Sequence, residues 1–117
     1  PGLAEAHCVL AQLLQEQGKA REAADEIGEA LRLDSESWEV NREAARLKFR
    51  AGQIEEAIPL YIKAAALMPS DWHSPMMLTT CYQSIGDDDE VQLSARLTLE
   101  RSEKAVAKNP ANTQALA

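Results

Sequence analysis

Apolar residues recur at intervals of three and four along almost the whole chain, with polar residues between them. This spacing places apolar side chains on one face of an α-helix. Near the middle of the chain, Val40, Ala44 and Leu47 form one such stripe, and Ala57 and Tyr61 begin another. The pattern predicts an all-α protein with helices at about residues 4–17, 20–33, 38–51, 54–68, 72–85 and 88–108.

The pattern also repeats at a fixed interval. Gly18, Gly52 and Gly86 are evenly spaced, and Trp38 and Trp72 are separated by the same step. A glycine after the last periodic residue of a helix supplies the left-handed backbone conformation that ends the helix. A fixed period of about 34 residues indicates stacked units of two helices each. We expect a single domain over residues 1–117, with units at about 4–35, 38–69 and 72–110 and a partial unit at 111–117.

The second helix of the third unit is expected to be longer than its counterparts. The stretch from the turn glycine to the closing proline runs from Gly86 to Pro110 in the third unit, but only from Gly52 to Pro69 in the second. The third stretch is longer by about seven residues, which make nearly two helical turns. The helix at 88–108 is therefore predicted to project beyond its neighbours, and Leu93 and Leu97 on it are candidates for self-association.

Two faces of the third predicted helix are apolar. Val40, Ala44 and Leu47 are expected to face the partner helix of the same unit. Trp38, Ala45 and Phe49 are expected to face a neighbouring unit. A third, charged face is left open to solvent.

Composition excludes several functions. The chain has 12 basic and 19 acidic residues and a net charge of -7, which is opposite to what phosphate binding requires, so we expect no nucleic-acid partner. No apolar run approaches the roughly 20 residues that a membrane span needs. The N-terminus lacks a charged segment followed by an apolar one, so we expect no secretory signal and a cytoplasmic location.

Catalytic and metal-binding groups do not gather in the sequence. Cys8 and Cys81 lack the paired spacing of a zinc site and lie in apolar helical stripes, where thiols are usually inert. His7 and His73 fall on first helices two units apart, so no nucleophile, base and orienting group converge. We expect no metal, no cofactor and no enzyme activity in this chain, and its being a region of an enzyme polypeptide is the alternative.

The period, the paired helices, the turn glycines, the alanines of the second helices and the closing prolines resemble the tetratricopeptide repeat (TPR) family. The segments that carry the resemblance are LAQLLQEQGKAREAADEIGEAL, ARLKFRAGQIEEAIPLYIKAAALMP and LTTCYQSIGDDDE. It implies a right-handed superhelix of antiparallel helix pairs, with the first helices lining a concave face. It also implies a protein-interaction scaffold or regulatory segment of a larger protein. The long final helix, ending TLERSEKAVAKNPAN, looks like the repeat regions of some bacterial adenylate cyclases.

A row of arginines is the main candidate for partner binding. Arg42, Arg46 and Arg50 recur every four residues and share one side of the third predicted helix. Arginine suits the bidentate capture of carboxylates, so the expected partner is a protein or peptide with acidic groups. Glu39 and Glu43 precede the first two arginines by three residues. The alternative is that these glutamates pair with the arginines and only solvate the helix.

Some family members hold the acidic C-terminal tails of cytosolic chaperones with lysines and asparagines along the groove. The matching positions of this chain hold Cys8, Gln12, Glu43, His73 and Met77. None is a lysine or an asparagine, so we expect only weak binding of such tails. Gln12, His73 and Met77 remain candidates for other contacts in the groove.

Overall fold

The computed structural model describes residues 2–108, which are all-α. They form six helices: α1 (Leu3–Glu16), α2 (Ala20–Leu33), α3 (Trp38–Arg50), α4 (Ile54–Leu67), α5 (His73–Ile85) and α6 (Asp88–Lys108). Every helix end lies within one residue of the end predicted from the sequence. The partial unit at 111–117 and the last two residues of the third unit lie outside the described residues.

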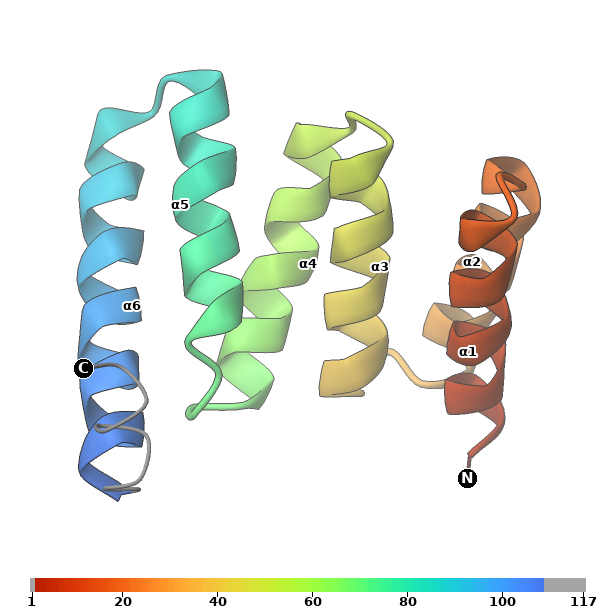
Figure 1. Ribbon diagram of the computed structural model, residues 1–117, viewed down its shortest axis with the longest axis horizontal. Coiled ribbons are helices and arrows are strands. Elements are labelled where there is room, and N and C mark those ends of the chain that lie inside the picture. The colour runs from red at the N-terminus through yellow and green to blue at the C-terminus, as the bar shows by residue number, and fades with distance from the viewer. Residues whose placement is uncertain (1, 109–117) are drawn as a thin grey trace.

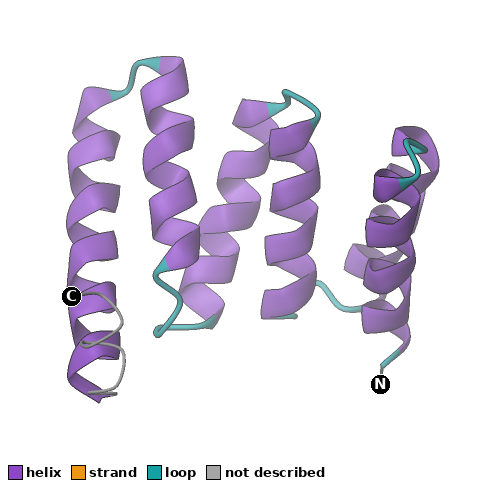
Figure 2. Cartoon of the chain, viewed as in Figure 1, coloured by secondary structure: helices purple, strands orange, loops and turns teal. Residues whose placement is uncertain are grey.

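The helices stand side by side in three antiparallel pairs, α1–α2, α3–α4 and α5–α6 (Figure 1). Short loops connect them, as the secondary-structure colouring shows (Figure 2). Within a unit the two helices pack extensively. Between units, α4 packs on α5 more closely than α2 packs on α3. No helix between residues 2 and 108 is long and apolar enough to cross a membrane.

The turn glycines end the first helices as predicted. Gly18, Gly52 and Gly86 have φ angles of 79°, 80° and 79°, in the left-handed region that other residues rarely adopt. After the second of them, the Gln53 amide donates to the Lys48 carbonyl at 2.9 Å, which satisfies an orphan carbonyl of α3. The even spacing of the glycines therefore sets where each first helix ends.

The core consists of two clusters that meet at α3. The first cluster joins α1, α2 and α3 and contains Val40, Ala44 and Leu47. The second joins α3, α4 and α5 and contains Ala45, with Phe49 packed against it. The prediction that Ala45 and Phe49 face a neighbouring unit is confirmed, since their cluster includes residues of α5. The stripe expected to face the partner helix lies mainly with α1 and α2 of the preceding unit, and from α4 only Leu60 packs against this cluster. Helical periodicity defines which residues share a face, but not which helix covers it.

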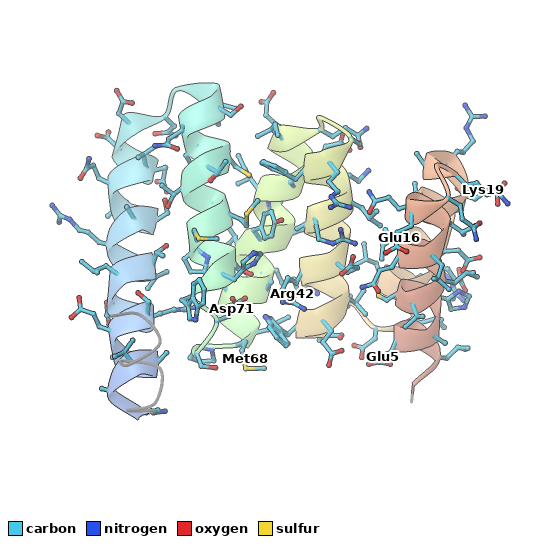
Figure 3. All side chains as sticks on the ribbon, viewed as in Figure 1. Glu5, Glu16, Lys19, Arg42, Met68 and Asp71 are labelled. Atoms are coloured by element: carbon cyan, nitrogen blue, oxygen red, sulfur yellow. The ribbon has the colours of Figure 1, made fainter. Side chains whose placement is uncertain are left out.

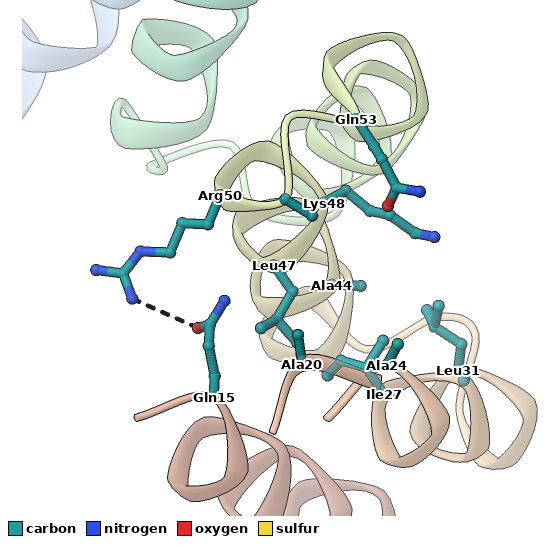
Figure 4. A pocket seen from close by; sticks show the side chains of 12 residues that line it. Gln15, Ala20, Ala24, Ile27, Leu31, Ala44, Leu47, Lys48, Arg50 and Gln53 are labelled. Atoms are coloured by element: carbon teal, nitrogen blue, oxygen red, sulfur yellow. Dashed lines mark hydrogen bonds between the residues drawn. The ribbon is translucent and has the colours of Figure 1, made fainter. Parts of the chain in front are cut away.

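The looser junction between α2 and α3 contains an apolar cavity of about 300 Å³ (Figure 4). Ala24 and Gly28 line it from α2, and Ala44 and Leu47 line it from α3. Ile58 occupies the position of Ala24 one unit later, and its side chain packs against the second core cluster. Small residues on α2 therefore leave a cavity at the α2–α3 junction. In the second unit, the larger side chain of Ile58 packs into the core instead.

Replacing Gly28 by alanine is expected to stabilise the protein by about 0.5–1 kcal/mol, because a mid-helix glycine loses more backbone entropy on folding than alanine. A Cβ added at Gly28 would meet no atom within 4 Å. Urea unfolding followed by circular dichroism measures the change. Gly52→Ala is the matched control and should destabilise, because its φ of +80° strains any side chain. If both variants changed the free energy of unfolding in the same direction, this explanation would be contradicted.

Helix α6 is 21 residues long, and its C-terminal end extends past α4 and α5 in Figure 1, which confirms the predicted projection. Leu93 is 60% exposed and Leu97 is half-buried. Both lie in the part of α6 that pairs with α5, because the neighbouring Ser94 accepts a 2.8 Å hydrogen bond from Thr79. The projecting end therefore carries neither of them.

Candidate functional site

Two cavities lie along the first helices α1, α3 and α5. The α1–α3 cavity has a volume of about 100 Å³ and is lined by Glu5, Cys8, Val9, Gln12, Glu39, Arg42 and Glu43. The α3–α5 cavity has a volume of about 270 Å³ and is lined by Arg42, Glu43, Arg46, Tyr61 and His73. Arg42 and Glu43 line both cavities, so the two cavities are neighbours along α3, and together they are called the groove below.

Arg42 provides a cation that has no carboxylate partner among residues 2–108. Its guanidinium lies over the Trp38 ring, 4.7 Å from the ring centroid. This cation–π contact holds the side chain in place without neutralising it. The alternative pairing with Glu39 is not formed. Figure 3 shows Arg42 on the middle unit, with Asp71 and Met68 at the adjoining α4–α5 turn.

Arg46 behaves differently, because it is paired within its own helix. Its Nε donates to the Glu43 carboxylate at 2.7 Å, and its Nη2 donates to the same oxygen. Glu43 is only 6% exposed. For this pair, the interpretation as an intrahelical ion pair is correct. Two guanidiniums and one carboxylate therefore leave one net positive charge in the α3–α5 cavity.

Arg50 and Met77 are not part of either groove cavity. Arg50 is exposed and donates to the Gln15 side chain of α1 at 3.4 Å, at the other end of α3 (Figure 4). Met77 is half-buried against the second core cluster. The arginine row therefore does not act as one unit, because four residues advance a helix by about 6 Å and carry Arg50 past the cavity. Gln12 and His73 do line the groove, as expected.

Tyr61 and His73 bring two buried polar atoms to the α3–α5 cavity. Tyr61 is fully buried, and within the described part of the chain neither its hydroxyl nor Nδ1 of His73 has a hydrogen-bond partner. Burial raises the pKa of Tyr61 to about 12, with a further contribution from Cys81 that the nearby arginines oppose. The phenol therefore keeps its proton and can act as a donor at neutral pH.

Periodicity assigned Tyr61 to the core, and its ring is indeed there. Its hydroxyl was missed as a functional group. A tyrosine in an otherwise apolar stripe was the available signal, because a buried phenolic hydroxyl usually has a partner.

The α1–α3 cavity has the opposite electrostatic character. Burial raises the pKa of the Cys8 thiol to about 11, and the carboxylates of Glu43, Glu5 and Glu39 add to the effect in that order. The groove is therefore polarised along its length, positive toward α5 and negative toward α1.

Both cysteines are free and buried, and they lie in different core clusters. Burial also raises the pKa of Cys81. Because the thiolate is the reactive form, the native protein at pH 8 should react with iodoacetamide about a hundredfold more slowly than the denatured chain. Mass spectrometry of timed samples measures both rates. Rapid labelling of either cysteine in the native state would contradict the burial described here.

Asp71 connects the parts of this site. Its carboxylate accepts from the Trp38 indole at 2.8 Å and from the Ser74 amide at 2.9 Å. The first bond positions the ring under Arg42, and the second caps the start of α5, where His73 lies. Burial opposes ionisation of Asp71, but hydrogen bonds from Ser74, Trp38 and the His73 amide outweigh it and lower its pKa.

No group of three or more metal-ligating side chains is found in residues 2–108. In the acidic run that follows Gly86, the Asp87 side chain accepts from the Glu90 amide at 3.2 Å. This contact caps α6, which agrees with the role predicted for acidic residues at a helix N-terminus.

The fold is that of TPR-like helical repeat proteins. The structure superposes on MamA with a TM-score of 0.84 at 21% identity, covering 89% of this chain and 61% of MamA. It matches SycD, the type III secretion translocator chaperone of Yersinia enterocolitica, with a TM-score of 0.78 at 19% identity, over 97% of this chain and 83% of that one. It matches the second TPR of Spaghetti (RPAP3), bound to the HSP90 peptide SRMEEVD, with a TM-score of 0.75 at 16% identity, covering 83% of this chain and 90% of the RPAP3 chain.

No protein-family model matches the chain, and no curated protein matches it in sequence. The likeness to solved structures therefore establishes the fold alone. It gives no support to the resemblance to adenylate cyclase repeats. The chain spans about three fifths of MamA, 61% of its length.

Proposed function

We propose that this chain is a protein-binding module that holds a peptide or protein segment in the groove along α1, α3 and α5. TPR-like folds are typical protein-interaction modules, and the similar RPAP3 domain was solved with a bound peptide. A scaffold or regulatory role in the cytoplasm, within a larger protein, belongs to the same proposal. We propose no catalytic role for the chain.

Arg42 is the observation that carries the proposal. The residue lines both cavities, and its guanidinium lies over Trp38 and has no carboxylate partner among the described residues. A preorganised, unpaired arginine is suited to a charge-assisted hydrogen bond with an acidic group. The proposed ligand is therefore a segment that contains an acidic residue.

A panel of fluorescein-labelled twelve-residue peptides tests this proposal. Each peptide contains one internal glutamate in a varied uncharged sequence, and its control has glutamine at that place. We expect some glutamate peptides to bind, and Arg42→Glu to weaken them about tenfold or more in fluorescence anisotropy. Arg21→Glu makes the same charge change on the exposed face of α2 and should have no effect. Equal binding by wild type and Arg42→Glu would refute the proposed role of Arg42.

The acidic chaperone tail SRMEEVD is expected to bind weakly, with a Kd above about 100 μM. Gln12 and Glu43 line the α1–α3 cavity. By the resemblance, they stand where some family members have lysine or asparagine. Met77 at a third such position packs against the core. Isothermal titration calorimetry measures the affinity, and micromolar binding of this peptide would contradict the expectation.

Self-association through α6 is a second candidate function. Leu93 and Leu99 are each 60% exposed on this helix. If a second copy covers them, Leu93→Asp combined with Leu99→Asp should convert an oligomer to a monomer in analytical ultracentrifugation. A monomeric wild-type protein at high micromolar concentration would eliminate this candidate.

A further inference from the structure

We propose that the α3–α5 cavity receives one carboxylate of the bound segment, from an internal acidic side chain, and that Tyr61 and His73 donate hydrogen bonds to it. This inference rests on the proposed function, because the carboxylate belongs to the segment held in the groove. The inference specifies where that carboxylate binds, which is called the carboxylate seat below, and which groups recognise it.

The donors are the unsatisfied buried atoms of the cavity. The Tyr61 hydroxyl and His73 Nδ1 are both buried and without a partner within residues 2–108, and both side chains line the same cavity. Buried polar groups are nearly always hydrogen-bonded, so an unpartnered pair on two side chains that line one cavity indicates that a ligand supplies the missing partner. A carboxylate has two oxygens that accept only, and it can satisfy both donors at once. Histidine then carries its proton on Nδ1.

The charges of the cavity favour a single anion. Arg46 forms an ion pair with Glu43. Arg42, which stacks on Trp38, is therefore the cation that can neutralise an entering carboxylate. The cavity volume of about 270 Å³ accommodates a carboxylate and the side-chain methylenes behind it. Uncharged ligands of the same shape would leave the guanidinium without a counterion.

A second carboxylate beside the first is disfavoured. Toward α1, the groove is lined by Glu5 and Glu39, and these carboxylates help to raise the pKa of Cys8. A like charge placed there would be repelled. The site therefore selects an isolated acidic residue over a pair, which agrees with the weak binding expected for the chaperone tail.

The test has a small-molecule arm and a peptide arm, both on the full chain. In the first, sodium acetate is titrated into the protein while NMR follows the imidazole signals of the two histidines, with sodium chloride matching ionic strength. We expect saturable shifts at His73 and none at His7, which is paired with Glu26. In the second arm, the single-glutamate peptides are measured against two variants of the only tyrosines, Tyr61→Phe and Tyr82→Phe.

Tyr61→Phe should weaken the binding of both acetate and the single-glutamate peptides about tenfold, since it removes one hydrogen bond to a charged group. Its Tm should equal or exceed that of wild type, because the hydroxyl has no partner in residues 2–108. Tyr82→Phe, whose ring lies outside the cavity, should bind as wild type does. His73→Phe should weaken the binding of both ligands to a similar extent as Tyr61→Phe.

The outcomes separate the two proposals. If peptides bind and depend on Arg42, but Tyr61→Phe and His73→Phe bind equally well, the carboxylate seat is refuted and the proposed function stands. If acetate shifts His73 with the expected Tyr61 dependence but no acidic peptide binds, the seat is supported and the proposed function fails. If neither probe binds, both are refuted.

A peptide with two adjacent glutamates that binds more tightly than the single-glutamate peptide would refute the selection of an isolated acid.

Discussion

Replacing Asp71 by alanine is expected to lower the free energy of unfolding by about 2–4 kcal/mol, because three donors lose their acceptor at once. The Trp38 indole and both the amide and the hydroxyl of Ser74 donate to this carboxylate, which is 7% exposed. The indole bond joins α3 to the start of α5, and the two bonds from Ser74 cap α5. The variant should therefore also weaken peptide binding, since Trp38 supports Arg42 and α5 carries His73.

The repeat supplies a matched control for this change. Ser37 occupies the position of Asp71 one unit earlier and caps α3 in the same way, accepting from the Val40 amide at 3.3 Å. Ser37→Ala loses only the cap and should cost about 1 kcal/mol. Chemical denaturation of both variants gives the comparison. If the two losses of stability are equal, the bonds from the Trp38 indole and the Ser74 hydroxyl contribute nothing to stability.

Asp71 also predicts a pH dependence. The pKa of this carboxyl is lower in the folded protein than in the unfolded chain, because hydrogen bonds from Ser74 and Trp38 outweigh the opposing effect of burial. Its stabilising effect is therefore complete above the unfolded pKa of about 4 and is lost as the pH falls through the lower folded value. The stability difference between wild type and Asp71→Asn should shrink on acidification. A difference that stays constant from pH 6 to pH 2.5 would contradict the lowered pKa.

The helices could be predicted closely because local chemistry determines them. A left-handed glycine ends each first helix, and the same apolar spacing returns in each unit. Such signals depend only on neighbours in sequence, so the helix bounds agree to within one residue.

The packing partners of α3 could be predicted only in part from the same pattern. Val40 and Ala45 lie on different apolar faces, and both have no exposed surface. Which face meets α4 depends on how the pairs rotate against each other, and side-chain volumes on several helices decide this together. Ala24 and Gly28 on α2 show the effect, since their small size leaves a gap to α3.

The candidate site was predicted in part. Arg42, Arg46, Gln12 and His73 were named from the sequence and do line the groove. Their roles could not be separated, because spacing alone does not show that Arg46 pairs with Glu43 while Arg42 stacks on an indole. Tyr61 lines the cavity from α4, a second helix, whereas the sequence pattern predicts groove positions only on first helices.

Arg101 is a further residue whose role depends on tertiary structure. It lies on α6, at the position that Leu33 and Leu67 occupy in the earlier units when each unit is aligned on its turn glycine. Its Nη1 donates to the carbonyls of Ala65 and Asp71 at 2.9 Å. It therefore stabilises the C-terminal end of α4 and the loop that leads to α5.

Replacing Arg101 by alanine is expected to destabilise the protein by about 1.5–3 kcal/mol, because charge-assisted bonds to the carbonyls at a helix C-terminus are lost. Arg101→Leu restores the residue type of the earlier units, but it should not rescue stability, since the carbonyls stay unpaired. Arg96→Ala, on an exposed site of the same helix, should change stability by less than about 0.5 kcal/mol.

Thermal and urea unfolding of the three variants decide between hydrogen bonding and packing. A stable Arg101→Leu would show that packing alone fastens α6 to the loop. If instead Arg101→Leu and Arg101→Ala lose similar stability, hydrogen bonding holds the loop. Because that loop contains Asp71, which caps α5 and bonds to Trp38, the same variants should then also bind the single-glutamate peptides more weakly. The long last helix would in that case support the groove from the opposite side of the third unit, without contacting the ligand.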